Sequence, residues 1–559
     1  MFRCNTFNKI AVTFSSIMVA LSTSTALSTD VHRGRSEVFR TYNTAAYNKC
    51  GFHIIVHYIN RPNSSQTLKA ILQTRPTSDT SIVSPSGEFR IFFDTTGVNE
   101  PALFETNGQQ IPHSAFAFAD SAAKIADHVY EVEVDSMGFP PAPGTDSAAG
   151  AGQYYIYIQS LPTGEYGETD ADYSHPIIER TNPTYRAWTV IRNEFQSTYT
   201  KGVAAMKVTI AHEYNHGIQL GNYGLWPNDL WFYELTSTWM EQVVYPQVKD
   251  YYQYLPVFYE NVSLPFNEYD PYSYAGYERC VFGIFVQHEY PDVDVMKLIW
   301  QNMSHEPVLP ATQDAFRSIG VNPAYAFQLF TEWNYLTGYR APLASQYGYT
   351  TYPLAAAYPL ARIAGEGNLS ATGVDFYESA LPLSEHFYQV NDGPDTIGIA
   401  VVNTDFSSAE AGDTLNSQYG VGISTNATNC MKQLSGGYCM FLDVPSYTNW
   451  AMVPFIFGDA LSPTNNVPFP QPFNPDGGTL RIPYPFHDAV GATLLVYGIS
   501  GQLVDKQSGD NYVQVYLRGK YFVWNGRSST GKAVSTGVYI YVLSDGSNSI
   551  VGKIAVVKN

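Results

Sequence analysis

The sequence predicts a multidomain chain in which an α+β domain is followed by two β-sandwich domains. Strand-like and helical segments alternate from Ser86, and helical periodicity dominates from Met206 to about Tyr339. Past about Leu360, short alternating runs separated by Gly, Asn, Ser and Asp are typical of sandwich modules. The 45% apolar and 14% charged residues indicate folded protein, and 559 residues suit about three or four domains.

The expected domain boundaries follow shifts in composition along the chain. They are 1–28 for a signal peptide, 29–85 for an N-terminal extension or propeptide, 86–360 for the α+β domain, 361–461 for the first sandwich, 462–475 for a Pro-rich linker and 476–559 for the second sandwich. No repeat of solenoid period is visible.

The N-terminus has the features of a secretory signal peptide. Arg3 and Lys9 precede an apolar run from Ile10 to Leu21, and a small-residue end follows near Ser28. This run is shorter than the ~20 apolar residues that span a bilayer. We therefore expect a secreted or cell-surface protein without an integral membrane span. A formal net charge of −19 argues against nucleic acid as a partner, because such binding requires clustered Lys and Arg.

Four short segments are assigned before the helical region. Phe52–Tyr58, within the N-terminal extension, has the character of a strand, and Gly87–Asp94 and Gln153–Leu161 are further expected strands. Between them, Phe118–Gly138 has the periodicity of an amphipathic helix.

Four cysteines remain after the signal peptide. An exporting compartment permits disulfides, and Cys430 with Cys439 is the expected pair among three connectivities. Cys280 lies in an apolar helical pattern typical of a buried thiol. None of the four, Cys50 included, has the spacing of a metal site.

One stretch, VTIAHEYNHGIQ at Val208–Gln219, carries the chemistry. Residues four apart on a helix lie on one face and one turn apart, so His212 and His216 present both imidazoles to one point. Glu213 can reach a water at a metal held there without itself ligating the metal. The pattern predicts a catalytic zinc site.

A catalytic zinc takes three protein ligands and leaves one position for water, so a third ligand is required. Gln219 and Asn222 stand where a metzincin has its glycine and third histidine, which excludes that class. The gluzincin alternative is a glutamate on a following helix, and Asn228–Pro246 reads as one. Glu234, 18 positions after the second histidine, is the expected ligand, with Glu241 as its rival and Asp229 as a weaker one.

Hydrolysis through a tetrahedral intermediate also requires a donor for the oxyanion. Tyr277, at the start of an apolar helical stripe, is the candidate, and Tyr274 is the alternative. In a chain with 43 tyrosines, a packing role is the competing interpretation.

The ordered motifs between Arg75 and Tyr339 resemble a family of secreted bacterial metalloproteases of the gluzincin type. They are SPSGEFRIFFDTTG, MGFPPAPGTD, YYIYIQSLPTGEYGETD, TIAHEYNHGIQ and ELTSTWMEQVVYP. The resemblance implies a zincin-like fold and a zinc peptidase. Its zinc ligands would be His212, His216 and Glu234, and its general base would be Glu213. Phe92, in FRIFFD, stands where a histidine would be expected.

The end of the chain resembles C-terminal Ig-like domains of the flagellar hook-cap type and the sorting domains of the type IX secretion system. The motifs are PQPFNPDGGTLRIPYPF, LLVYGISGQLV, YFVWNGRSSTGKAVSTGVYIYVL and GKIAVVKN. They read as a seven-strand sandwich with Trp524 in its core. The resemblance implies secretion machinery or cell-surface attachment as a partner, and a plain spacer is the alternative.

Two functions are consistent with these features. The first is a secreted zinc-dependent endopeptidase acting on protein or peptide substrates. The second is a non-catalytic surface protein that binds glycans or mediates adhesion on the same scaffold. Glu213 favours the enzyme, because a binding protein needs no general base between two ligands. Calcium is a further candidate ion at the acidic stretch Gly167–Tyr173, which lacks EF-hand spacing.

Overall fold

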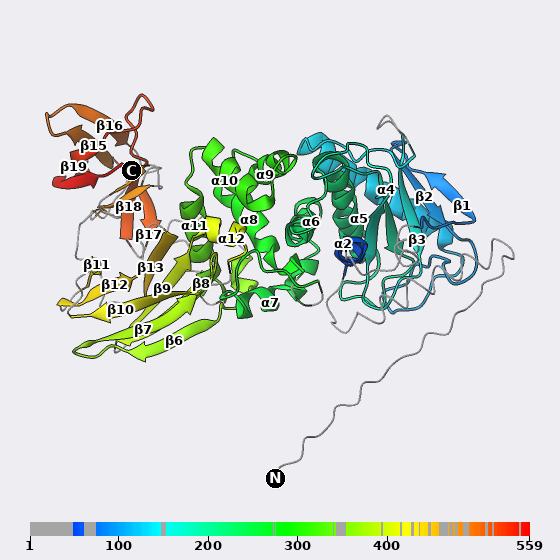
Figure 1. Cartoon of the computed structure of the whole chain (residues 1–559), viewed down its shortest axis with the longest axis horizontal. Helices are drawn as coiled ribbons and strands as arrows, with labels where there is room; N and C mark the ends of the chain where they lie inside the picture. The colour runs from blue at the N-terminus through cyan, green and yellow to red at the C-terminus, as the bar shows by residue number, and fades with distance from the viewer. Residues whose placement is uncertain are drawn as a thin grey trace, which may run out of the picture.

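The computed structural model describes residues 49–60, 74–146, 152–338 except 272 and 274, 340–341, and 354–558 with short gaps. The described chain is mixed α/β and forms several sheets (Figure 1). An open sheet with its helices comes first, a group of helices follows, and two further pairs of sheets complete it. The expected signal peptide and most of the expected linker lie outside the described residues. Within those residues no helix is long and apolar enough to cross a bilayer.

The first sheet has the strand order β1-β2-β3-β5-β4. Its strands are β1 (Thr80–Val83), β2 (Phe89–Phe93), β3 (Tyr154–Gln159), β4 (Gly167–Ala171) and β5 (Ala187–Arg192). β2, β3 and β5 are parallel, and β1 and β4 are antiparallel edge strands. β5 is buried along its whole length, and four of its six residues are apolar, as is typical of a strand covered on both faces. The strands predicted at Gly87–Asp94 and Gln153–Leu161 are confirmed as β2 and β3.

Two long helices lie against this sheet. α4 (Ala115–Tyr130) packs on β1 and β2, and α5 (Gly202–Ile218) packs on β4 and β5. Each continues into a π-helical turn, η1 (Glu131–Ser136) and η2 (Gln219–Tyr223). The predicted helix at 118–138 is thus confirmed, with its last turn in the π form. Every residue of α5 from Val208 onward is buried, because the helix lies between the sheet and the helices that follow.

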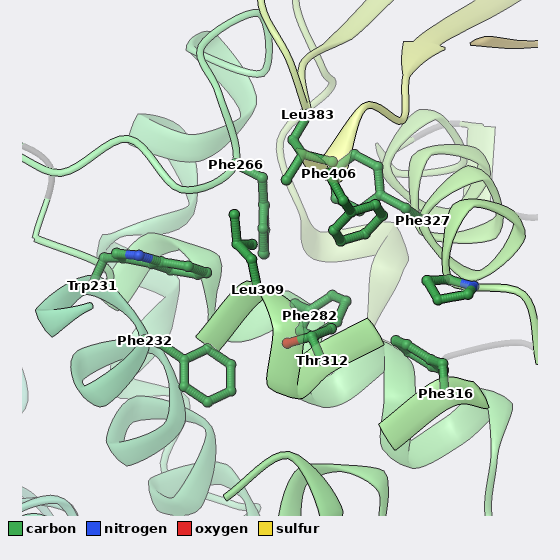
Figure 2. Close-up of a pocket in the computed structure, with 11 residues that line it drawn as sticks. Trp231, Phe232, Phe266, Phe282, Leu309, Thr312, Phe316, Phe327, Leu383 and Phe406 are labelled. Carbon is green, nitrogen blue, oxygen red and sulfur yellow. The ribbon is translucent and has the colours of Figure 1, made fainter. Parts of the chain in front are cut away.

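A group of helices continues the chain. They are α6 (Leu230–Val244), η3 (Asp250–Gln253), α7 (Leu255–Glu260), η4 (Tyr277–Arg279), α8 (Cys280–Glu289), α9 (Val295–Met303), α10 (Val308–Ser318) and α11 (Pro323–Tyr335). α6 packs between α5 and α8. Aromatic side chains line a pocket between these helices, and Figure 2 shows Phe266 there, close to Leu383 and Phe406 from the region of the following sheets. The first sheet, these helices and a few residues of the next sheet therefore share one apolar core.

Two four-stranded sheets follow, with the orders β11-β12-β10-β7 and β13-β9-β8-β6. Their strands are β6 (Ile363–Asn368), β7 (Gly373–Ala380), β8 (Glu385–Asp392), β9 (Asp395–Asn403), β10 (Ser417–Ser424), β11 (Cys430–Gln433), β12 (Cys439–Asp443) and β13 (Trp450–Phe457). Their apolar side chains form a common cluster that includes Tyr388, Ile399 and Val421. A disulfide joins Cys430 to Cys439, which confirms the predicted pair.

The last described part contains a three-stranded sheet, β14-β18-β17, and a four-stranded sheet, β16-β15-β19-β20. The strands are β14 (Leu480–Tyr484), β15 (Thr493–Gly498), β16 (Leu503–Ser508), β17 (Val513–Tyr516), β18 (Gly519–Trp524), β19 (Gly537–Ser544) and β20 (Ser549–Val556). Trp524 is fully buried in the cluster between them, as predicted.

The described residues Lys49–Asn60, here called the N-terminal segment, lie against β4 and begin with an extended stretch. The Gly51 N–H donates to the Gly167 carbonyl at 3.0 Å, and Cys50 bridges Gly167 in the parallel direction. The rest forms helix α2 (Phe52–Asn60), so the strand expected at Phe52–Tyr58 is wrong. A short continuous apolar run does not distinguish a buried helix from a buried strand.

The acidic stretch proposed for calcium is also different from expectation. Residues 167–171 of it form strand β4, and all five are buried. The stretch is therefore mainly a buried strand and not an acidic loop, and its alternating acidic side chains belong to a covered edge strand.

Glu385, the first residue of β8, is buried where the sheets meet α11. The Asn334 side-chain amide donates to Oε1 at 3.0 Å and to Oε2 at 3.1 Å. Burial raises the pKa of Glu385 from 4.5 to about 8, although the hydrogen bond from Asn334 opposes the rise. The folded state therefore holds this proton more tightly than the unfolded state does.

This difference predicts a loss of stability as the pH rises from about 4.5 to about 8, where only the unfolded state releases the proton. Glu385→Gln should remove that loss, so the gain in Tm over wild type should be at least about 2 °C larger at pH 8 than at pH 5. Differential scanning calorimetry at both pH values, with the exposed Glu366→Gln as control, measures it. Equal gains at both pH values would contradict the prediction.

Candidate metal centre

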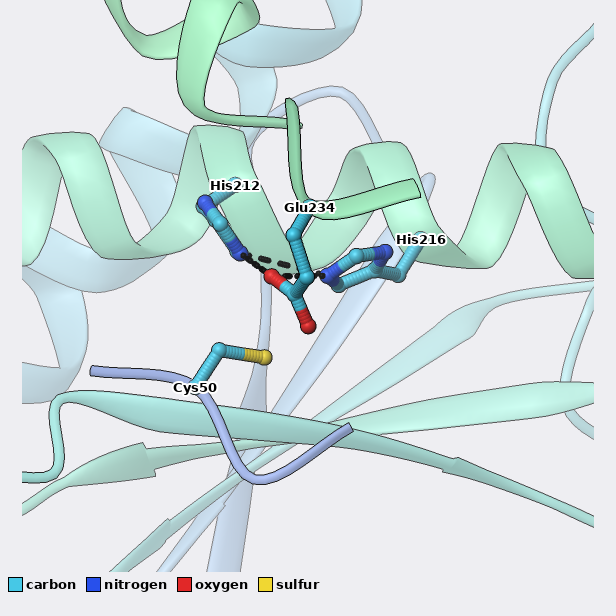
Figure 3. A group of neighbouring side chains, drawn as sticks. All are labelled: Cys50, His212, His216 and Glu234. Atoms are coloured by element: carbon cyan, nitrogen blue, oxygen red, sulfur yellow. Dashed lines mark hydrogen bonds and ion pairs between the residues drawn. The ribbon is translucent and has the colours of Figure 1, made fainter. Parts of the chain in front are cut away.

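The three predicted ligands converge between α5 and α6. His212 and His216 come from successive turns of α5, and Glu234 comes from the second turn of α6. A fourth residue, Cys50 of the N-terminal segment, joins them: one ligand atom from each of the four lies within 4.8 Å of the others (Figure 3). All four side chains are fully buried.

The three predicted ligands have spacings that suit one metal ion. Glu234 Oε2 lies 3.0 Å from His212 Nε2 and 3.5 Å from His216 Nε2, and the two Nε2 atoms are 3.2 Å apart. A tetrahedral ion with bonds of about 2.0–2.1 Å sets its ligand atoms about 3.3 Å apart. Two imidazoles and a carboxylate are also a donor set that zinc takes in catalytic sites. These residues therefore fit a zinc ion.

Both imidazoles are oriented through their other nitrogen. His212 Nδ1 donates to Glu241 Oε1 at 2.8 Å, and His216 Nδ1 donates to Gln219 Oε1 at 2.7 Å. The Gln219 amide nitrogen donates to Asn215 Oδ1 at 2.7 Å, which fixes the direction of that amide. This tautomer leaves each Nε2 lone pair directed at the cluster, as a metal ligand requires.

Glu234 carries the negative charge around which the imidazoles of the cluster lie. Its second oxygen, Oε1, lies 2.8 Å from Nδ1 of His53, a residue of α2. Burial alone would raise the pKa of Glu234, but His216, His53 and His212 lower it well below its usual value. Burial would likewise lower the pKa of His212, but hydrogen bonds to Glu234 and Glu241 raise it to about 9.

Glu213 lies beside the cluster and outside the group of ligands. Its Oε2 accepts a hydrogen bond from Thr169 Oγ1 of β4 at 2.8 Å, and the Cys50 thiol lies 3.5 Å from the same oxygen. Burial raises the pKa of Glu213, while His212 and His216 oppose the rise. A carboxylate with an elevated pKa is suited to accept and return a proton.

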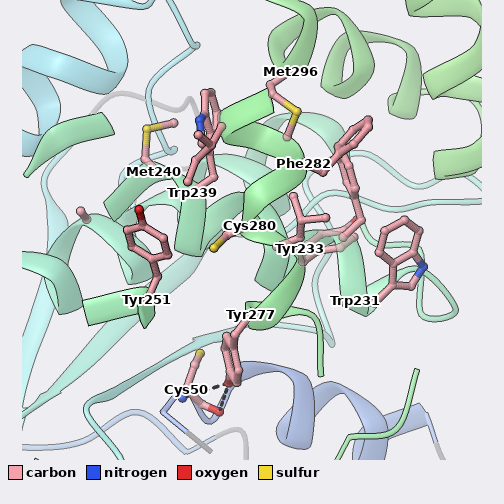
Figure 4. Close-up of a cluster of buried hydrophobic side chains, with 14 of the residues drawn as sticks. Cys50, Trp231, Tyr233, Trp239, Met240, Tyr251, Tyr277, Cys280, Phe282 and Met296 are labelled. Atoms are coloured by element: carbon pink, nitrogen blue, oxygen red, sulfur yellow. Dashed lines mark hydrogen bonds between the residues drawn. The ribbon is translucent and has the colours of Figure 1, made fainter. Parts of the chain in front are cut away.

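Tyr277 also reaches the site, from η4. Its hydroxyl accepts a hydrogen bond from the Cys50 N–H at 3.1 Å and donates to the Cys50 carbonyl at 3.3 Å (Figure 4). Burial raises the pKa of Tyr277 well above its usual value, and Glu234 raises it further, so the phenol stays protonated and able to donate. Tyr274, the alternative donor, lies outside the described residues.

The two rival ligands have other roles. Glu241 orients His212 from the far side of the imidazole and forms an ion pair with Lys49 at 2.6 Å. Asp229 accepts a hydrogen bond from the Val308 N–H at 3.0 Å, away from the cluster. Phe92 stacks on Tyr157, 4.7 Å between ring centres, in a cluster on the opposite sheet face from α5.

Sequence reasoning missed the contribution of the N-terminal segment. No spacing pattern in the sequence marks Cys50 as a ligand, yet its sulfur lies in the cluster, more than 160 positions from His212. His53, three residues later, also contacts a predicted ligand. The available signal was a cysteine and a histidine within four residues in an otherwise apolar stretch, CGFH.

No protein-family model and no curated protein matches this chain. Two solved structures from Porphyromonas gingivalis show slight likeness. One is PorZ, described as an essential bacterial surface component of the type IX secretion system, with 19% identity over 21% of this chain and 15% of its own, and a TM-score of 0.14. The other is dimeric latent PorU, with 15% identity over 33% of this chain and 20% of its own, and a TM-score of 0.13. Likeness this slight assigns neither fold nor function.

The orienting role of Glu241 predicts a weaker metal site when its charge is removed. Glu241→Gln should lower zinc affinity by a factor of about 10–100, because the His212 imidazole loses its carboxylate partner. Competition with a chromophoric chelator measures the affinity, and Glu260→Gln, at an exposed helix end, is the control. An unchanged affinity would show that Glu241 does not orient a ligand.

Proposed function

We propose that this chain is a secreted zinc-dependent endopeptidase with a zincin-like domain. The observation that carries the proposal is the meeting of His212, His216 and Glu234 at one buried point with Glu213 beside it. Three ligands of this kind with an adjacent, non-ligating carboxylate are the set required for metal-assisted hydrolysis. Zinc, when bound, polarises a carbonyl and lowers the pKa of water.

The side chains of this site have separate roles in the remaining steps of the reaction. Glu213, with its raised pKa, takes a proton from the attacking water and returns it to the leaving amine. Thr169 holds the Glu213 carboxylate in position through its hydroxyl. Tyr277 donates to the oxygen on which negative charge develops. Its hydroxyl already donates to a peptide carbonyl, that of Cys50, which supports this role.

The substrate class follows from the sheet edge beside the cluster. β4 is an edge strand, and an extended peptide can add to such an edge through backbone hydrogen bonds. The contacts of Gly51 with Gly167 show that this edge pairs with extended backbone. A peptide paired there passes Glu213, so protein or peptide chains are the proposed substrates.

The last seven strands are proposed as a domain for sorting or surface attachment. The proposal rests on the resemblance of their motifs to type IX sorting domains and on the two sheets that enclose Trp524. Together with the expected signal peptide, it supports a secreted or cell-surface location and the secretion machinery as a partner. The competing adhesion or glycan-binding function gives Glu213 and Thr169 no role.

Glu213→Gln tests the reaction directly. The variant should keep its zinc, because Glu213 is not a ligand, and should cleave a mixed peptide library at a rate lower by about 10²–10⁴. Metal content and mass-spectrometric cleavage are measured for both proteins, intact and after limited proteolysis between Asn60 and Thr80, which leaves strand β1 in place. Glu260→Gln should behave as wild type. If the parent cleaves nothing in either form, the peptidase proposal is overturned.

Tyr277→Phe tests the oxyanion donor. The loss of one donor should lower kcat by about 10²–10³ with little change in KM or zinc content. Tyr254→Phe is the matched control, because Tyr254 packs against the Tyr277 ring at 5.0 Å and is equally buried. If both variants lower kcat equally, or neither does, Tyr277 serves packing only.

A further inference from the structure

Cys50 occupies the side of the cluster that an active zinc site leaves open. Its sulfur approaches the two imidazoles and Glu234 from the sheet side (Figure 3), and it accepts a hydrogen bond from the Phe52 N–H at 3.3 Å. A thiolate is a strong ligand for zinc, and four protein ligands close a tetrahedral ion. With Cys50 bound, no position remains for water.

We propose that Cys50 is a fourth ligand of the metal centre and that the N-terminal segment thereby keeps the peptidase latent. This inference rests on the proposed function and specifies its regulation. Release of the segment breaks the metal–sulfur bond, the sulfur takes up a proton from solvent, and water enters the vacated position. No oxidation or reduction is involved.

The segment also engages each group that the reaction needs. The Cys50 thiol contacts Glu213. The backbone N–H and carbonyl of Cys50 both form hydrogen bonds with the Tyr277 hydroxyl. Gly51 pairs with the β4 edge, where the substrate backbone is proposed to bind. The same few residues therefore cover the base, the oxyanion donor and the substrate edge at once.

Three residues of the segment make further contacts that hold it in place. Lys49 is buried and forms ion pairs of 2.6 Å with both Glu241 and Asp250. The Phe52 ring stacks on His216 with 4.2 Å between ring centres, and His53 joins Glu234 to the Pro271 carbonyl. Removing the segment takes the Lys49 ammonium away from two buried carboxylates, which keep only weaker partners such as His212 for Glu241 and the Tyr166 hydroxyl for Asp250. Such contacts are expected of a segment of the same chain that is folded into the site.

The test uses the full chain loaded with zinc and combines structure with activity. X-ray absorption at the zinc edge should show one sulfur neighbour at about 2.3 Å in wild type, in addition to nitrogen and oxygen at about 2.0–2.1 Å. Cys50→Ser should lose the sulfur neighbour and keep the zinc. Cys280→Ser, which removes the other buried free thiol, should keep both.

Peptidase activity is measured on the same samples. Cys50→Ser should cleave peptides at least about tenfold faster than intact wild type, and Cys50→Ser with Glu213→Gln should not cleave. Zinc without a sulfur neighbour in wild type overturns the ligand assignment even if Cys50→Ser misfolds. A sulfur neighbour without a gain in activity, both in Cys50→Ser and after cleavage of wild type between Asn60 and Thr80, overturns latency. A chain that cleaves through Glu213 while intact keeps the proposed function and rejects this inference, whereas a chain that binds no zinc rejects both.

Discussion

The buried carboxylate of Glu234 is the constraint on which the site depends. One of its oxygens faces two imidazoles from α5, and the other faces the His53 imidazole from α2. A buried anion without such partners would destabilise the fold by several kcal/mol. Glu234 therefore joins α2, α5 and α6 in addition to their apolar packing, and any metal between the imidazoles would be held by the same arrangement.

A series of buried basic and acidic side chains in contact with one another continues from His212, away from Glu234. His212 contacts Glu241, Glu241 contacts Lys49, and Lys49 contacts Asp250, with every member of the series buried. On the other side, the Gln219 amide joins His216 to Ser237 and to its own helix turn. Networks in which every polar group has a partner orient side chains in a way that an apolar core cannot. The imidazole directions follow from these partners.

Local patterns in the sequence were enough to find one half of this site. His212, Glu213 and His216 are neighbours on one helix, and Glu234 lies on the next, so periodicity and spacing predicted their meeting. Two of the five strands of the first sheet, β2 and β3, followed from apolar runs in the same way. The prediction of Tyr277 rested only on its place at the start of an apolar helical stripe. The structure alone distinguished the ligand Glu234 from its rivals Asp229 and Glu241.

The other half came from contacts that no local pattern encodes. Residues 167–171 look like an acidic loop, because a polar strand that is covered by a helix and by another segment keeps its charged side chains. Phe52–Tyr58 looks like a strand, because its apolar residues are contiguous and helix α2 buries them on several sides. Cys50 meets Glu213 across a separation of 163 residues, which only the folded chain reveals.

Covalent attachment explains how so short a segment can block the site. Only 19 residues separate Asn60 from Thr80 in the sequence, so the segment is held near the cluster at an effective concentration in the millimolar range. Contacts that would be weak between separate molecules then suffice for nearly full occupancy. A single cut between the two residues changes this, because the released segment is diluted and a competing substrate gains access to the β4 edge. In an intact chain, by contrast, the Cys50 thiol rebinds at the same place each time the N-terminal segment dissociates.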